Sequence, residues 1–180
     1  MAILAKDEGG TFIPAPEGQF QAVCCDVVDM GNVQTTWEGK TRSVHKIRIV
    51  FQLDELGDDN KPFMVSQWLT LSLGEKANLR KFLESWRGKK FTGDELRDGF
   101  DVEKLVAANA LLQVVHNAKG EKVYANIQSI MKAPKGAQPM APKDYIRVKD
   151  RPTDTPQTPS NGTAQSFPAA LVEEDDDLPF

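Results

Sequence analysis

Residues 43–53 read SVHKIRIVFQL, and the alternation in this stretch decides the predicted fold. The odd positions from His45 to Leu53 are mostly large and apolar, whereas the even positions between them include Lys46 and Arg48. Successive side chains of a strand point to opposite faces, so a period of two predicts a strand with one buried face. We therefore predict that His45 and the other odd positions lie in the core, with Lys46 and Arg48 on the outer face.

Further elements follow on both sides of this strand. A β-branched run upstream predicts a strand that ends at a bend, Gly31-Asn32, and a polar loop over 34–41 follows. Downstream, the helical spacing of large apolar residues up to Trp86 predicts a helix, which a polar loop separates from the next element. The predicted elements are strands at 19–30, 43–53 and 62–71, helices at 75–86 and 102–106, and strands at 111–116 and 123–130.

The order of these elements indicates the fold class. Three strands, a helix and two strands make up an OB-fold, a five-stranded Greek-key barrel. Other small barrels and α+β sandwiches share parts of this order. We predict a mainly β protein in which residues 1–132 form a five-stranded OB-fold barrel, with one helix between strands 3 and 4.

The composition changes after this predicted domain. Seven of the eleven prolines lie between residues 133 and 170, and no apolar period persists there. This composition predicts a disordered Pro-rich linker over 133–170, followed by a separate acidic tip and tail at 171–180. Within the linker, the alternation of residues 145–149, YIRVK, indicates either a short edge strand or a basic contact.

Charge is distributed unevenly along the chain. The net charge is −4, but residues 151–180 carry one arginine and six carboxylates, so they account for −5 and the remainder for +1. A slightly basic body with an acidic end is typical of nucleic-acid contact in the body and of partner binding through the tail.

Several classes of function lack the residues they need. Cys24 and Cys25 are adjacent, so neither a disulfide between them nor a shared metal is expected, and two histidines add no zinc cluster. No phosphate-binding GxxxxGK[ST] loop is present, and the densest acidic group in the body, residues 54–59, fits a turn. We expect no enzyme activity, cofactor or metal. Without a signal sequence or an apolar run of about 20 residues, we expect a cytoplasmic protein with no membrane partner.

An OB-fold holds its ligand over strands two and three, between the loops that join strands one-two and four-five. There, cations follow the phosphates of single strands and aromatic rings stack on bases. Trp68 either packs in the core or stacks in this groove, and Lys46 and Arg48 are either solvated or in contact with DNA. The predicted DNA-binding residues are Trp37, Lys40, Arg42, Lys46, Arg48, Trp68, Lys119, Lys122 and Tyr124.

The chain ends in VEEDDDLPF, residues 172–180, where five carboxylates precede an apolar tip. Like charges and three apolar residues cannot form a core of their own. This end resembles the C-terminal tip of bacterial single-stranded DNA-binding proteins. The resemblance implies that host replication and repair proteins bind a segment made of Asp175, Asp176, Asp177, Leu178, Pro179 and Phe180.

The body lacks the usual N-terminal pattern of those bacterial proteins. It is similar instead to divergent OB-fold proteins encoded by tailed bacteriophages, in the segments TWEGK (36–40), KIRIV (46–50), KANLRKFL (76–83) and YANI (124–127). This resemblance implies sequence-independent single-stranded DNA binding during phage replication or recombination in the host bacterial cytoplasm. A homo-oligomer is compatible with it, but a tetramer is not implied. The alternative is a replication or recombination adapter that uses the tail to reach host proteins and binds DNA poorly.

Overall fold

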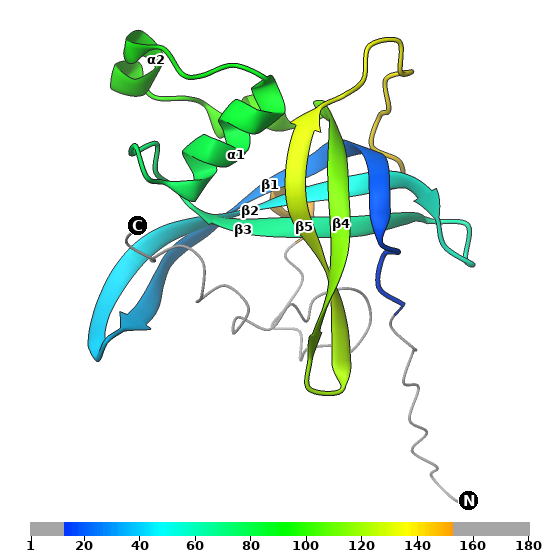
Figure 1. Ribbon diagram of the computed structural model, residues 1–180, viewed down its shortest axis with the longest axis horizontal. Helices are drawn as coiled ribbons and strands as arrows, with labels where there is room; N and C mark the ends of the chain where they lie inside the picture. Colours follow the sequence, from blue (N-terminus) through cyan, green and yellow to red (C-terminus); the bar gives the residue numbers. More distant parts are fainter. Residues whose placement is uncertain (1–12, 153–180) are drawn as a thin grey trace, which may run out of the picture.

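The computed structural model describes residues 13–152, which are organised by one antiparallel five-stranded sheet (Figure 1). The strands are β1 (Gly18–Trp37), β2 (Lys40–Leu56), β3 (Pro62–Thr70), β4 (Asn109–Lys119) and β5 (Lys122–Lys132). Between β3 and β4 lie α1 (Asn78–Arg87), α2 (Gly93–Asp98) and the 3-10 turn η1 (Val102–Leu105), and a second such turn, η2 (Val148–Asp150), follows β5. The strand order is β3-β2-β1-β4-β5. The mainly β architecture, with its main helix between the third and fourth strands, is confirmed.

β1 and β2 form a hairpin much longer than the sequence indicates. They pair from Ala22 with Leu53 to Trp37 with Lys40, and the turn residues Glu38 and Gly39 have φ angles of 48° and 75°. Positive φ at both central residues is typical of a type I′ turn, whose twist matches that of the flanking strands. The predicted polar loop over 34–41 is therefore wrong. At Gly31 the ladder shifts register and continues, because a bulge accommodates the bend without ending the strand.

The main core lies between one face of the sheet and α1. Phe51 of β2 packs against Phe82 and Trp86 of the helix, with ring centroids 6.4 and 5.3 Å apart. The predicted helix is confirmed, and it ends at Gly88, whose φ of 71° is the left-handed conformation that glycine adopts readily. The alternation predicts His45 in this core; the structure instead leaves it half-buried, with Nε2 2.6 Å from Oδ1 of Asp29.

The two edge strands of the sheet are brought together without being paired. Within residues 13–152, no ladder joins β3 to β5. The two strands nevertheless contact each other, and α1 contacts both. Trp86 of α1 also donates Nε1–H to the carbonyl of Asn109 at 2.8 Å. The described sheet is therefore open, and the closed barrel stays a prediction.

A short helix lies where the sequence analysis places only a polar loop. Helix α2 begins at a capping box, in which Thr92 Oγ1 accepts from the Glu95 N–H at 3.2 Å. In return, the Glu95 carboxylate accepts from the Thr92 N–H at 2.9 Å. These reciprocal bonds satisfy donors that would otherwise have no partner at the start of the helix. The spacing Thr-x-x-Glu is visible in the sequence and is the signal that was missed. The short helix predicted over 102–106 is confirmed as η1.

Residues 133–151, called the strap from here on, return across the outer face of the sheet. Asn109 bonds both backbone groups of Met140, accepting from N–H at 2.7 Å and donating to C=O at 3.0 Å. Gln52 of β2 does the same with Lys143, at 2.8 and 2.7 Å. Two side-chain amides therefore hold the strap as a neighbouring strand would hold it.

The strap covers the face of β1 and β2 that points away from the main core, so both faces of these strands are buried there. Val23, Cys25 and Val50 lie opposite the main core, yet each is at most 5% exposed. This packing of residues 138–151 differs from the disordered linker predicted over 133–170; the rest of that prediction, from residue 153, lies outside the described residues. The predicted acidic tip at 171–180 lies outside them too. No helix within residues 13–152 is long and apolar enough to cross a membrane.

Candidate nucleic-acid interface

Two hairpin arms carry most of the exposed residues predicted to bind DNA. The β1–β2 arm comprises residues 31–46 and the β4–β5 arm residues 116–125, and both extend away from the helices in Figure 1. Trp37 is 39% exposed at the tip of the first arm. The twisted strands and the two-residue turn place Trp37 at the end of the arm. The hairpin backbone, and not packing of the side chain, therefore determines the position of its ring. The exposed predicted residues are Trp37, Lys40 and Arg42 on the first arm, and Lys119 and Lys122 on the second.

Two other predicted contacts are buried. Lys46, at the base of the β1–β2 arm, is only 2% exposed, and Tyr124 of the β4–β5 arm is 8% exposed. The period of two places Lys46 correctly on the face opposite Ile47, but that face is not a free surface. Neither side chain offers an appreciable area to a ligand in this structure.

Arg48 and Trp68 face each other across β2 and β3, on the side of the sheet opposite the main core. The two residues are register partners, and both are half-buried. Arg48 Nε, Trp68 Nε1 and Ser66 Oγ are buried without a hydrogen-bond partner in residues 13–152. Ser66 pairs with Val50 in the same ladder, so the three polar atoms come from adjacent cross-strand pairs. An unsatisfied buried donor costs about 1–3 kcal/mol, so these enclosed atoms are a local cost to the stability of the fold.

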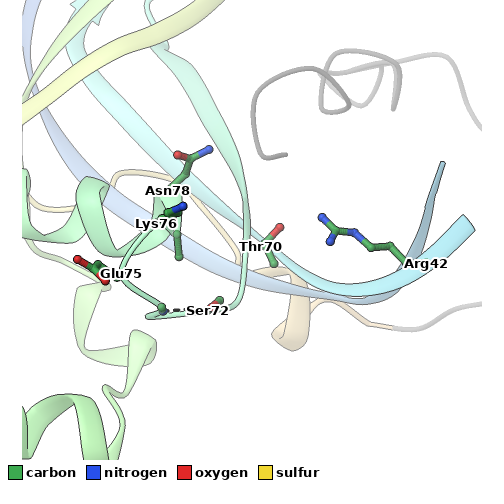
Figure 2. Close-up of a pocket in the computed structure, with 8 residues that line it drawn as sticks. Arg42, Thr70, Ser72, Glu75, Lys76 and Asn78 are labelled. Carbon is green, nitrogen blue, oxygen red and sulfur yellow. Dashed lines mark hydrogen bonds between the residues drawn. The ribbon is translucent and has the colours of Figure 1, made fainter. Parts of the chain in front are cut away.

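A hollow of about 500 Å³ lies at the base of the β1–β2 arm, where β3 leads into α1 (Figure 2). Its lining includes Arg42, Thr70, Ser72, Glu75, Lys76 and Asn78. Helix α1 begins here without a side-chain cap at Ala77 and without an acidic residue in its first turn. Backbone N–H groups at the start of a helix favour an anion, and the positive charges of Arg42 and Lys76 outnumber the one carboxylate, Glu75. The chemistry of the hollow therefore suits a phosphate better than a cation.

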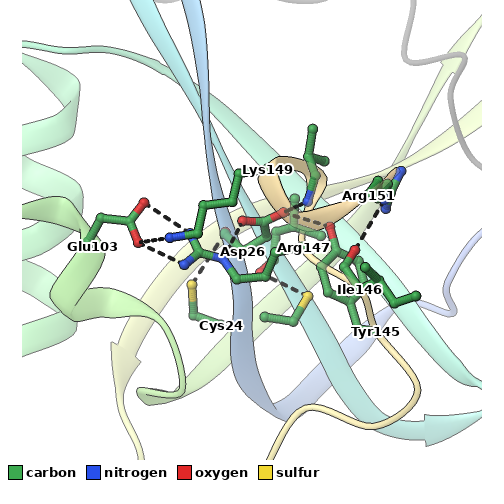
Figure 3. Close-up of polar contacts among 11 residues, drawn as sticks. Cys24, Asp26, Glu103, Tyr145, Ile146, Arg147, Lys149 and Arg151 are labelled. Carbon is green, nitrogen blue, oxygen red and sulfur yellow. Dashed lines mark hydrogen bonds and ion pairs between the residues drawn. The ribbon is translucent and has the colours of Figure 1, made fainter. Parts of the chain in front are cut away.

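One buried carboxylate fastens the strap to the sheet, on the same side as Arg48 and Trp68 (Figure 3). Asp26 of β1 is 1% exposed and accepts from the Tyr145 hydroxyl at 3.0 Å, Arg147 Nε at 3.0 Å and the Val148 N–H at 2.8 Å. Arg147 also spans to the Glu103 carboxylate, at 2.8 and 3.0 Å. Burial raises the pKa of Asp26, but the bonds from Val148, Arg147 and Tyr145 outweigh it and hold that pKa below its ordinary value.

Both cysteines are free and buried, Cys24 in the main core and Cys25 on the face that the strap covers. Burial, and then the neighbouring Asp26 charge, raise the pKa of Cys25 to about 12. Burial likewise raises the pKa of Cys24. Both thiols therefore stay protonated near neutral pH and are poor nucleophiles. In the described part of the chain, no three His, Cys, Asp or Glu side chains gather closely enough to hold a metal ion.

Comparison with known proteins adds no family to these observations. No protein-family model matches the chain, and no curated protein matches its sequence significantly. Sequence reasoning did not predict that residues 138–151 pack on the sheet; the one signal was the alternation at 145–149, which indicated an edge strand or a basic contact.

Proposed function

We propose that this protein binds single-stranded DNA without sequence preference and without enzymatic activity. The observation that carries the proposal is the tip of the β1–β2 arm, where an exposed Trp37 lies beside the exposed cations Lys40 and Arg42. Sequence-independent binding of single strands needs these two components, rings that stack on any base and cations that follow the phosphates. Lys119 and Lys122 supply further exposed cations at the other arm.

The arrangement of the strands supports an OB-type barrel as the scaffold. The contact between β3 and β5, with α1 against both, matches the place where such a barrel closes around its helix. In that fold the ligand crosses strands two and three between two loops, which correspond here to the two arm tips. Arg48 and Trp68 then lie on the ligand face, and the hollow beside Arg42 and Lys76 accepts a backbone phosphate.

The tail carries the second half of the proposal. Residues 171–180 combine carboxylates with an apolar, aromatic end, which suits a basic pocket with an apolar floor on another protein. The proposed partners are host replication, recombination and repair proteins. On the resemblance to phage proteins, we place this role in phage DNA metabolism in the host cytoplasm.

The adapter alternative gains support from one observation. Lys46 and Tyr124 are buried, which removes two of the nine predicted contacts. A titration of tryptophan fluorescence with oligo-dT separates the two functions. Binding should quench the fluorescence, and affinity should fall by about 0.7 log units per log unit of salt for each phosphate neutralised. Tight binding at moderate salt excludes the adapter, whereas no binding in dilute buffer excludes the proposed function.

A further inference from the structure

The positive charge of the described region is concentrated in the strap. Residues 133–151 contain five cations and two carboxylates, a net charge of +3. Residues 152–180 contain six carboxylates and no cation, a net charge of −6. Because the whole chain carries −4, residues 1–132 are left with −1. The basic character attributed to the body therefore comes from a segment that the composition alone assigns to a linker.

Docking of the strap uses few of these cations. Arg147 is committed to Asp26 and Glu103, and Lys149 Nζ lies 3.6 Å from the Glu103 carboxylate. Lys143 docks through its backbone, which leaves its ammonium group exposed. Arg151 is also exposed, and its guanidinium is placed by a 3.1 Å bond to the Ile146 carbonyl and by the Tyr145 ring, 5.6 Å away. A cation that is already positioned loses less conformational entropy on binding than a free one.

The strap ends next to the proposed ligand face. Its backbone at Lys143 bonds to the side chain of Gln52 on β2. Its later residues bond to Asp26 of β1 (Figure 3). Asp26, which accepts bonds from the strap, is the register partner of Val50 on β2. Arg48 lies two residues before Val50 in the same strand and therefore on the same face of the sheet. Ile146, whose carbonyl accepts from Arg151, is 62% exposed, an apolar surface of the kind on which a base or sugar can pack.

We propose that the strap is an additional part of the single-strand-binding surface. Lys143 and Arg151 contact backbone phosphates of the DNA that crosses Arg48 and Trp68, and Ile146 packs against a nucleotide of the same strand. This inference rests on the proposed function and extends it: the DNA path leaves β2 and continues over a segment that follows the last strand.

The test compares two double variants of the full chain with equal loss of charge. Lys143→Gln with Arg151→Gln removes the strap cations, and Lys89→Gln with Lys90→Gln removes two exposed cations from the connection between α1 and α2. Oligo-dT affinity is measured for both and for the wild type across a salt series. Loss of two phosphate contacts should lower the slope of log affinity against log salt by about 1.4 in the strap variant. We expect its affinity at low salt to fall at least tenfold below that of the control.

The outcomes separate the two proposals. If the wild type binds and both variants keep the same slope and affinity, the strap inference is wrong and the proposed function stands. If the wild type does not bind oligo-dT, both fall.

A second measurement avoids any effect of substitution on folding. Amine-reactive labelling of the wild type should show Lys143 protected by saturating oligo-dT while Lys89 and Lys90 stay reactive. Unchanged labelling of Lys143 contradicts the inference. So does protection by polyglutamate at least as strong as that by oligo-dT, because it would indicate an acidic protein partner instead.

Discussion

Trp37 is the residue on which the proposed stacking contact depends most. It is 39% exposed at the last paired position of a long hairpin arm, so its removal deletes a ring without opening a cavity. One stacked base contributes about 1–3 kcal/mol, so Trp37→Ala should weaken oligo-dT binding about 5- to 150-fold. The matched control is Leu56→Ala, which removes a 47% exposed apolar side chain at the opposite end of β2. Circular dichroism should be unchanged in both, and equal affinities would exclude stacking at Trp37.

Asp26 fastens the strap, so its replacement should lower the free energy of unfolding. Asp26→Asn leaves Arg147 and Tyr145 with a weaker acceptor, at an expected cost of about 1–3 kcal/mol in the free energy of unfolding at pH 7. The folded protein lowers the pKa of Asp26 below 3.8, so its contribution is present above that pH and is lost as the pH falls through the folded value. The difference in the free energy of unfolding between the wild type and Asp26→Asn should therefore become smaller below pH 3.8.

Urea unfolding at pH 7 and at pH 3 measures this narrowing. Asp58→Asn, in the exposed turn after β2, removes the same charge without a packed partner and serves as the control. A gap between wild type and Asp26→Asn that is equally large at both pH values would show that ionisation of Asp26 does not fasten the strap.

The same scale shows what a sequence can say about single residues. A period of two assigns Ile49 and Phe51 to the core correctly, because burial on the inner face is dictated by the sheet itself. The same period cannot tell whether Lys46 is exposed or buried, because the exposure of an outer-face residue depends on what covers that face. Trp37 has mostly polar neighbours in sequence, which leave its ring little to pack against, and it is exposed in the structure.

At the scale of elements, the strap should be required for the folded unit. A chain ending at residue 132 lacks the segment that covers Cys25 and Val50, and it lacks the three groups that donate to Asp26. Each hydrogen bond to a charged group contributes about 1.5–3 kcal/mol, so this chain should unfold at clearly lower urea than one ending at 152.

Thiol labelling at pH 8 gives a second reading of the same truncation. Burial raises the pKa of Cys25 to about 12, so its thiol should label slowly in the chain that ends at 152 and quickly in the shorter one. Equal stability and equal labelling of the two chains would show that residues 133–152 are not required for the fold of the rest.

Elements were predictable where a periodic side-chain pattern defines them. Strand β3, helix α1 and the β4–β5 hairpin are confirmed because alternation or helical spacing marks each of them. The strap has no such pattern: its docking depends on backbone groups that Asn109 and Gln52 bind, and on one carboxylate. Its prolines, read as signs of a linker, are compatible with an extended segment held in this way. The bulge at Gly31 was read as a strand end because glycine permits either outcome.

At the scale of the whole molecule, the charge is divided between a strap of +3 and a C-terminal end of −6 in residues 152–180. Both belong to one chain, so the acidic end is always present at a high effective concentration near the proposed DNA surface. We expect the two polyanions, tail and DNA, to compete for the same cations. Deleting residues 173–180 should therefore strengthen oligo-dT binding at low salt.

The salt dependence of this effect identifies its cause. The Debye length shrinks from about 10 Å at 0.1 M salt to about 3 Å at 1 M, so the gain from the deletion should disappear as salt is added. Phe180→Ala keeps every tail carboxylate and is the matched control: it should leave DNA affinity unchanged while weakening binding to the proposed replication and repair partners. If the deletion leaves affinity unaltered at every ionic strength, the tail does not reach the cations that hold DNA, and the two halves of the molecule act independently.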